Sequence, residues 1–94
     1  MTIEGVSLFS RRPFAGPHTV TLLSKPGCHL CDDARVVIER VTKELGVTWE
    51  EVDITTDARL QHTYWEQIPV TFVDGAQHDF WRVDEKRLRR ALGA

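Results

Sequence analysis

The residues best suited to chemistry in this chain are its two cysteines, which lie in the stretch K-P-G-C-H-L-C at residues 25–31. Cys28 and Cys31 are three positions apart, a spacing typical of redox-active dithiols and of half of a zinc site. Thiol–disulfide exchange needs one thiolate that attacks and a second thiol that resolves the mixed disulfide. The stretch therefore offers a redox pair, part of a metal site or two packed thiols.

The surrounding sequence predicts that the cysteines lie where a strand leads into a helix. Residues 18–24, H-T-V-T-L-L-S, are rich in β-branched and apolar types and indicate a strand. After Cys28, apolar residues recur with helical period at positions 34, 37, 38, 41 and 45, and Gly46 supplies the stop. Cys28 would then face the unpaired N–H groups at the start of the helix, which lower the pKa of a thiol.

This position assigns different roles to the two thiols. We expect Cys28 to attack the substrate and Cys31, one turn into the helix and less exposed, to resolve the mixed disulfide. Lys25 adds a positive charge near Cys28, and His29 could assist when it is protonated. The carboxylates of Asp32 and Asp33 would oppose the thiolate if either side chain turned toward it. The balance of these charges favours a thiolate at Cys28.

The rest of the chain predicts an α/β domain with the order β-α-β-α-β-β-α and a four-stranded mixed sheet. The first two strands and the helix between them form a βαβ unit, so these strands should be parallel. Asp74-Gly75 between alternating apolar residues predicts a hairpin, because that turn needs positive φ at its centre. The further predicted elements are a strand at 47–54, a helix at 57–66, strands at 70–73 and 77–82, and a last helix capped by Asp84.

Length and composition indicate one domain, which we expect to be a cytoplasmic monomer. Its 94 residues, of which 41% are apolar, suffice for one core without a structural metal or a disulfide scaffold. The net charge of −2 argues against nucleic-acid binding, and no apolar run is long enough to span a membrane. Residues 1–17 lack the pattern of a secretory leader and are predicted to be a loosely ordered extension before a domain at 18–94.

Metal binding is one alternative to redox chemistry. A structural zinc site needs two more ligands, and the histidines at positions 18, 29, 62 and 78 show no H-x3–5-H spacing. An iron–sulfur cluster shared between two chains is a second alternative, and two inert buried cysteines are a third. Lys25 and Gly27 make the stretch too exposed for inert thiols. We therefore expect no metal, and no cofactor beyond the cysteine pair itself.

A second feature of interest is the segment I-P-V-T-F-V-D-G, which begins at Ile68. On local sequence, Pro69 is expected to be a helix stop before a strand. A cis-proline beside the cysteines is the alternative, and it would leave the backbone of Ile68 free to pair with an extended substrate. Tyr64, Trp65 and Trp81 could form a substrate platform, but we expect them to be core residues, the commoner role of such side chains.

Three segments together resemble the glutaredoxin-like branch of the thioredoxin-fold superfamily: K-P-G-C-H-L-C after a strand, I-P-V-T-F-V-D-G after a short helix, and the final hairpin and helix. The resemblance covers residues 18–93. It implies a redox-active Cys28–Cys31 disulfide, with Cys28 as the attacking thiol, and a cis Pro69 that faces the pair. The implied activity is reduction of protein disulfides or low-molecular-weight mixed disulfides with an unnamed electron donor; a binding or adaptor module without turnover is the alternative.

The chain departs from glutaredoxins at three places. The cysteines enclose His29-Leu30 instead of a Tyr or Phe, and Ile68 precedes the proline where glutaredoxins have a polar residue nearby. The segment W-R-V-D at 81–84 replaces a Gly-Gly-x-x-Asp stretch, whose glycines let the backbone approach the carboxylate of glutathione. Lys25 and Asp84 are kept at matching positions. The resemblance therefore leaves open whether glutathione binds.

Overall fold

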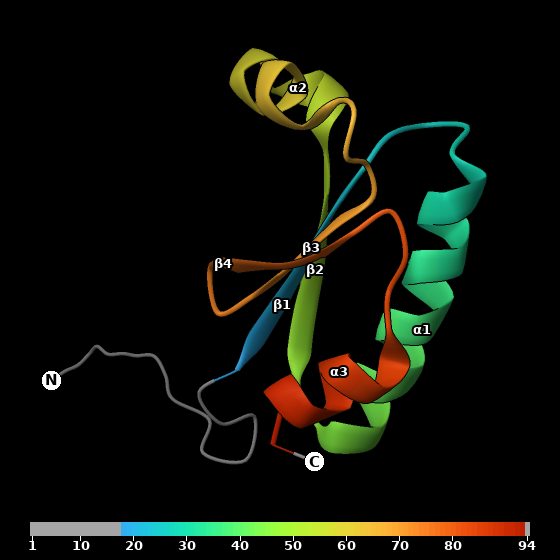
Figure 1. Ribbon diagram of the computed structural model, residues 1–94, viewed down its shortest axis with the longest axis vertical. Helices are drawn as coiled ribbons and strands as arrows, with labels where there is room; N and C mark the ends of the chain where they lie inside the picture. The colour runs from blue at the N-terminus through green and yellow to red at the C-terminus, as the bar shows by residue number, and fades with distance from the viewer. Residues whose placement is uncertain (1–17, 94) are drawn as a thin grey trace, which may run out of the picture.

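The computed structural model describes residues 18–93, which form one mixed sheet with α-helices packed against it (Figure 1). The predicted extension at residues 1–17 lies outside the described residues. The predicted order of strands and helices is confirmed. The strands are β1 (Thr19–Ser24), β2 (Thr48–Asp53), β3 (Val70–Val73) and β4 (Ala76–Phe80), and the helices are α1 (His29–Leu45), the 3₁₀ helix η1 (Ile54–Thr56), α2 (Ala58–Tyr64) and α3 (Glu85–Ala91).

The sheet has the strand order β2-β1-β3-β4. β1 and β2 are parallel, as the βαβ unit predicts, whereas β1–β3 and β3–β4 are antiparallel. The hairpin predicted between β3 and β4 is confirmed, with φ of 54° at Asp74 and 83° at Gly75. The carboxylate of Asp74 also accepts hydrogen bonds from the backbone N–H of Thr19 at 2.9 Å and from Nδ1 of His18 at 2.8 Å. The turn is thereby fastened to the start of β1.

The main core lies between the sheet and the two helices α1 and α3, which cover the same face (Figure 1). It contains the apolar stripe predicted for α1, and Gly46 ends that helix with φ of 69°. The carboxylate of Asp84 caps α3 by accepting a hydrogen bond from the N–H of Arg87, as predicted. The buried residues of this core are Val20, Leu22, Ala34, Ile38, Val41, Leu88 and Leu92.

A second, smaller core lies at the end of the sheet where β1 leads into α1. Its buried residues are Leu23, Cys31, Ile54, Ile68 and Val70. Tyr64 and Phe72 pack against it and meet edge to face, with ring centroids 5.8 Å apart. This core brings one of the two cysteines together with the segment around Pro69. It therefore positions the candidate site.

Two of the three aromatic residues expected in the core are exposed instead. Tyr64 is half-buried, but Trp65 is 58% exposed and Trp81 is 52% exposed. α2 ends at Tyr64, so Trp65 falls outside its packed stripe. β4 ends at Phe80, two residues earlier than predicted, because Trp81 has a φ of 67° and turns the chain out of the sheet. Between residues 18 and 93, no helix has the length and apolar character needed to cross a bilayer.

Candidate active site

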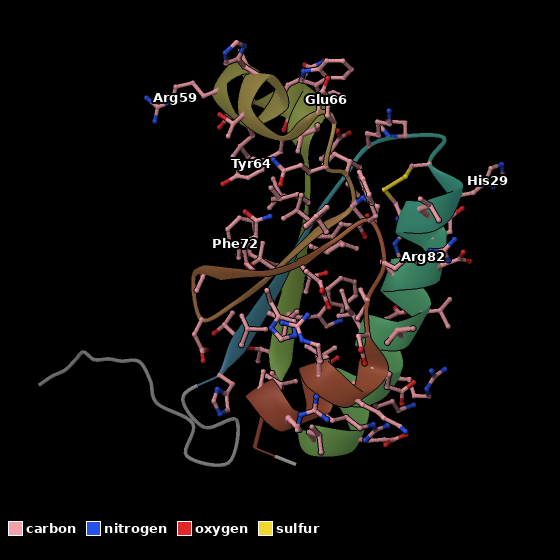
Figure 2. The ribbon with its side chains drawn as sticks, viewed as in Figure 1. His29, Arg59, Tyr64, Glu66, Phe72 and Arg82 are labelled. Atoms are coloured by element: carbon pink, nitrogen blue, oxygen red, sulfur yellow. A yellow bond between two sulfur atoms is a disulfide. The ribbon has the colours of Figure 1, made fainter. Side chains whose placement is uncertain are left out.

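The centre of the candidate site is a disulfide between Cys28 and Cys31, at the junction of β1 and α1 (Figure 2). The two Cα atoms are 5.2 Å apart. Cys28 is the N-cap residue of α1, and its Sγ accepts a hydrogen bond from the backbone N–H of Cys31 at 3.1 Å. Cys28 is half-buried, whereas Cys31 is 0% exposed. Only the sulfur of Cys28 is therefore within reach of a bulky substrate.

The position of Cys28 suits an anionic sulfur in the reduced protein. The first N–H groups of a helix lack intrahelical partners, and the helix dipole places partial positive charge there. Lys25 and His29 are both exposed on either side of Cys28. The imidazole of His29 points away from the disulfide in Figure 2. A lowered pKa of the Cys28 thiol in the reduced protein stays a prediction. Its physical basis is the position of Cys28 at the N-cap of α1.

The carboxylate of Asp32, which could have opposed a thiolate, is held by Arg35 at 2.8 Å. Arg35 also forms a two-pronged contact with Glu51 on β2, from Nε at 2.8 Å and from Nη2 at 2.6 Å. The hydroxyl of Ser24, at the end of β1, donates to the same carboxylate at 2.6 Å. These contacts tie the early turns of α1 to the ends of both parallel strands. The salt bridge also keeps the carboxylate of Asp32 turned toward the guanidinium of Arg35.

The sequence held one indirect signal for this cluster. Glu50 and Glu51 interrupt the apolar alternation of β2, and an isolated strand pattern gives no reason for it. In the sheet Glu51 pairs with Leu22, a residue of the core beneath α1, so both side chains lie on the α1 face. The hydrogen bonds from Arg35, together with the one from Ser24, lower the pKa of Glu51 against the opposing effect of burial.

We expect Glu51→Gln to lower the free energy of unfolding at pH 7 by about 1–2 kcal/mol, because a charge-assisted hydrogen-bond pair is lost. The pKa of Glu51 is lowered in the folded state, so its contribution is present above the ordinary pKa of a glutamate. It is lost as the pH falls through the lower folded value. Urea denaturation at pH 7 and pH 3 should show a difference between wild type and variant that shrinks in acid.

Glu50→Gln is the matched control, since Glu50 is the exposed neighbour on the opposite face of β2. We expect this change to alter stability by less than about 0.5 kcal/mol at either pH. A Glu51→Gln deficit of equal size at pH 7 and pH 3 would contradict an ionic role for Glu51.

The segment Ile68-Pro69 lies beside the cysteines, and its peptide bond is cis. Ile68 is 7% exposed and belongs to the same buried cluster as Cys31, and Cys28 packs against that cluster. Among the loop and turn hydrogen bonds of residues 18–93, none uses the backbone N–H or C=O of Ile68. The structure thus brings together both cysteines and the segment that the sequence singled out. Within the described residues, one peptide edge next to them has no backbone partner.

Two shallow grooves adjoin the active-site stretch. One has a volume of about 370 Å³ and is lined by Ser24, Lys25, Pro26, Arg35, Glu51 and Asp53. The other has a volume of about 230 Å³, lies beside the first turns of α1 and is lined by Leu30, Asp33, Ala34, Val37, Trp81, Arg82 and Val83. In the part of the chain that the structure describes, no three His, Cys, Asp or Glu side chains come together as a metal site.

The sheet topology and the C-x-x-C disulfide at the start of α1 define a redox-type protein of the thioredoxin fold. Solved structures support the fold. The described fold is similar to that of a mutant thioredoxin from Halobacterium salinarum, with a TM-score of 0.62 at 17% identity, over 81% of this chain and 72% of that one. It is also similar to Fasciola hepatica thioredoxin, with a TM-score of 0.56 at 22% identity, over 80% and 77% of the two chains.

Sequence comparison assigns the chain to a family within this structural class. Residues 19–93 match the family described as glutaredoxin-like domain (DUF836). The X-ray structure of target protein XcR50 from X. campestris is 30% identical, with a TM-score of 0.64, over 78% of this chain and 93% of that one. The chain therefore belongs to the glutaredoxin-like domain family. None of the curated proteins matches its sequence.

Proposed function

We propose that this protein is a thiol–disulfide oxidoreductase that reduces protein disulfides or low-molecular-weight mixed disulfides. The observation that carries the proposal is the unequal exposure of two bonded cysteines. Cys28 is half-buried at the N-cap of α1, whereas Cys31 has no exposed surface and lies one turn away. An accessible nucleophile and a protected resolving thiol are the two parts that thiol–disulfide exchange requires.

In the proposed reaction the reduced pair transfers two electrons to the substrate. The thiolate of Cys28 attacks one sulfur of the substrate disulfide, and the other substrate sulfur leaves as a thiolate. The thiolate of Cys31 then attacks Sγ of Cys28, which forms the intramolecular disulfide and releases the second substrate thiolate. The two thiolates take up two protons from water, equal to the two that the cysteines gave up. A thiol or dithiol reductant must afterwards reduce the Cys28–Cys31 disulfide.

We assign substrate contacts to the residues around this pair. The unpaired backbone of Ile68, before the cis Pro69, would pair with an extended segment beside the substrate's cysteine. Lys25 and His29 are both exposed near Cys28 and would contact the rim of the substrate. The proposal needs no cofactor beyond the disulfide, no nucleic acid and no membrane. It places a monomer in the cytoplasm, where cysteine pairs are more often catalytic than structural.

Catalysed reduction of a disulfide-linked peptide by dithiothreitol tests the proposal. We expect wild-type protein in trace amounts to accelerate thiol release over dithiothreitol alone. In a single turnover without dithiothreitol, two peptide thiols should appear for each protein, and the protein should lose about 2 Da as the pair is oxidised. Release no faster than the uncatalysed reaction would indicate an adaptor without turnover, and visible iron–sulfur absorbance after anaerobic purification would indicate a cluster carrier.

A further inference from the structure

Trp81, the first residue after β4, donates hydrogen bonds to three of the four carbonyl groups of residues 66–69. Its backbone N–H donates to the carbonyl of Pro69 at 2.7 Å and to that of Gln67 at 3.3 Å. Its indole Nε1–H donates to the carbonyl of Glu66 at 3.0 Å. A single residue thereby fastens the loop that connects α2 to β3.

The backbone conformation of Trp81 is unusual for a residue with a large side chain. Its φ of 67° lies in the left-handed region, which glycine adopts easily and which is unfavourable for a bulky residue. Burial does not explain the choice of tryptophan, because the side chain is 52% exposed and contacts Phe80 edge to face, at a centroid distance of 4.9 Å. The interaction that phenylalanine or glycine could not supply is the indole hydrogen bond to Glu66.

Ile68 is the remaining residue of the segment 66–69, and its backbone N–H and C=O take no part in the loop and turn hydrogen bonds of residues 18–93. Its side chain is fixed in the buried cluster that contains Cys31. With the carbonyls of its neighbours held by Trp81, the unpaired peptide edge of Ile68 is fixed beside the disulfide. A fixed edge pairs with an extended chain at a smaller entropy cost than a mobile one.

We propose that Trp81 is a positioning residue, which holds the loop 66–69 so that the backbone of Ile68 pairs with an extended polypeptide next to the disulfide to be reduced. This inference rests on the proposed function and narrows its substrate class. The preferred substrate has free backbone N–H and C=O groups beside its cysteine, as a polypeptide has. A compact disulfide without peptide groups would gain nothing from this edge.

Three disulfide substrates test the inference: a disulfide-linked peptide, the same peptide N-methylated at the residues next to its cysteine, and bis(2-hydroxyethyl) disulfide. We expect Trp81→Phe, which keeps an aromatic ring but lacks the N–H donor, to raise KM for the unmethylated peptide about 5-fold, roughly the effect of one hydrogen bond. Its kcat should change by less than about 2-fold, because the cysteines are untouched. KM for the methylated peptide and for the small disulfide should not change.

Trp65→Phe is the matched control, since Trp65 is 58% exposed near the same loop and its indole makes no hydrogen bond within residues 18–93. It should leave all three KM values unchanged. Trp81→Gly is a second variant, which removes the indole but also relieves the positive φ, and it should give the same selective rise in KM.

Equal changes in KM for all three substrates, or no change with either Trp81 variant, would overturn the role of Trp81. Failure of the proposed function is a different result. In that case wild-type protein itself would accelerate the reduction of none of the three disulfides. If wild type turns over both peptides with the same KM, the enzyme is an oxidoreductase that does not use the backbone of Ile68, and the positioning role of Trp81 is wrong.

Discussion

Cys28→Ser is expected to reduce catalysed disulfide reduction to the uncatalysed rate, a loss on the order of 1,000-fold. A serine hydroxyl is not ionised at neutral pH and does not attack a disulfide sulfur as a thiolate does. Cys31 cannot replace the lost nucleophile, because it is 0% exposed. The rate of peptide thiol release with dithiothreitol, after subtraction of the reaction without protein, measures the effect.

Serine is the informative replacement because Cys28 is also the N-cap of α1. Its Sγ accepts a hydrogen bond from the N–H of Cys31, and a serine oxygen fills the same role in many helices. Cys28→Ala should be equally inactive and about 1 kcal/mol less stable than Cys28→Ser. The stability of both variants is compared with that of reduced wild-type protein, so that the Cys28–Cys31 disulfide does not contribute to the difference. More than a tenth of wild-type activity in Cys28→Ser would show that another group attacks the substrate.

Local signals in the sequence were sufficient for most of the fold. The stop of α1 at Gly46, the hairpin at Asp74-Gly75 and the cap at Asp84 each depend on a backbone conformation or a hydrogen bond within a few residues. Such features are encoded by residue type at a single position, and their placement was predicted to within two residues. The position of Cys28 at the N-cap followed from the strand predicted before it and the helical period after it.

The parts that the sequence did not predict depend on contacts between distant residues. Arg35 and Glu51 are 16 positions apart, and the indole of Trp81 meets a carbonyl 15 positions earlier. Neither contact leaves a periodic pattern, because each pairs one side chain with one partner in a neighbouring element. The exposure of the Trp81 side chain was not predicted for a second reason, which is that large aromatic side chains are usually buried. The proximity of Ile68 to the cysteines came from the resemblance to a family.

Cys31→Ser is expected to convert the protein into a trap for its substrate. Cys28 can still attack a disulfide and release one substrate thiolate, but no second thiol is present to break the mixed disulfide. We expect at least about 10-fold more covalent complex than with wild type when either reduced protein is mixed with excess peptide disulfide, because the wild-type complex is resolved from within. Non-reducing electrophoresis and intact mass should show the complex, and dithiothreitol should release it.

The trap also tests which partner the site accepts. If Trp81 positions the loop for a polypeptide, the trapped fraction with a peptide disulfide should exceed that with bis(2-hydroxyethyl) disulfide at equal concentration. Adding Trp81→Phe to Cys31→Ser should lower the peptide complex and leave the complex with the small disulfide unchanged. If Cys31→Ser captures glutathione disulfide in preference to the peptide disulfide, the segment W-R-V-D at 81–84 accommodates glutathione although it lacks the glycine pair. Equal labelling of Cys28→Ser and Cys31→Ser would contradict the order of attack, because only one of these variants keeps the exposed sulfur.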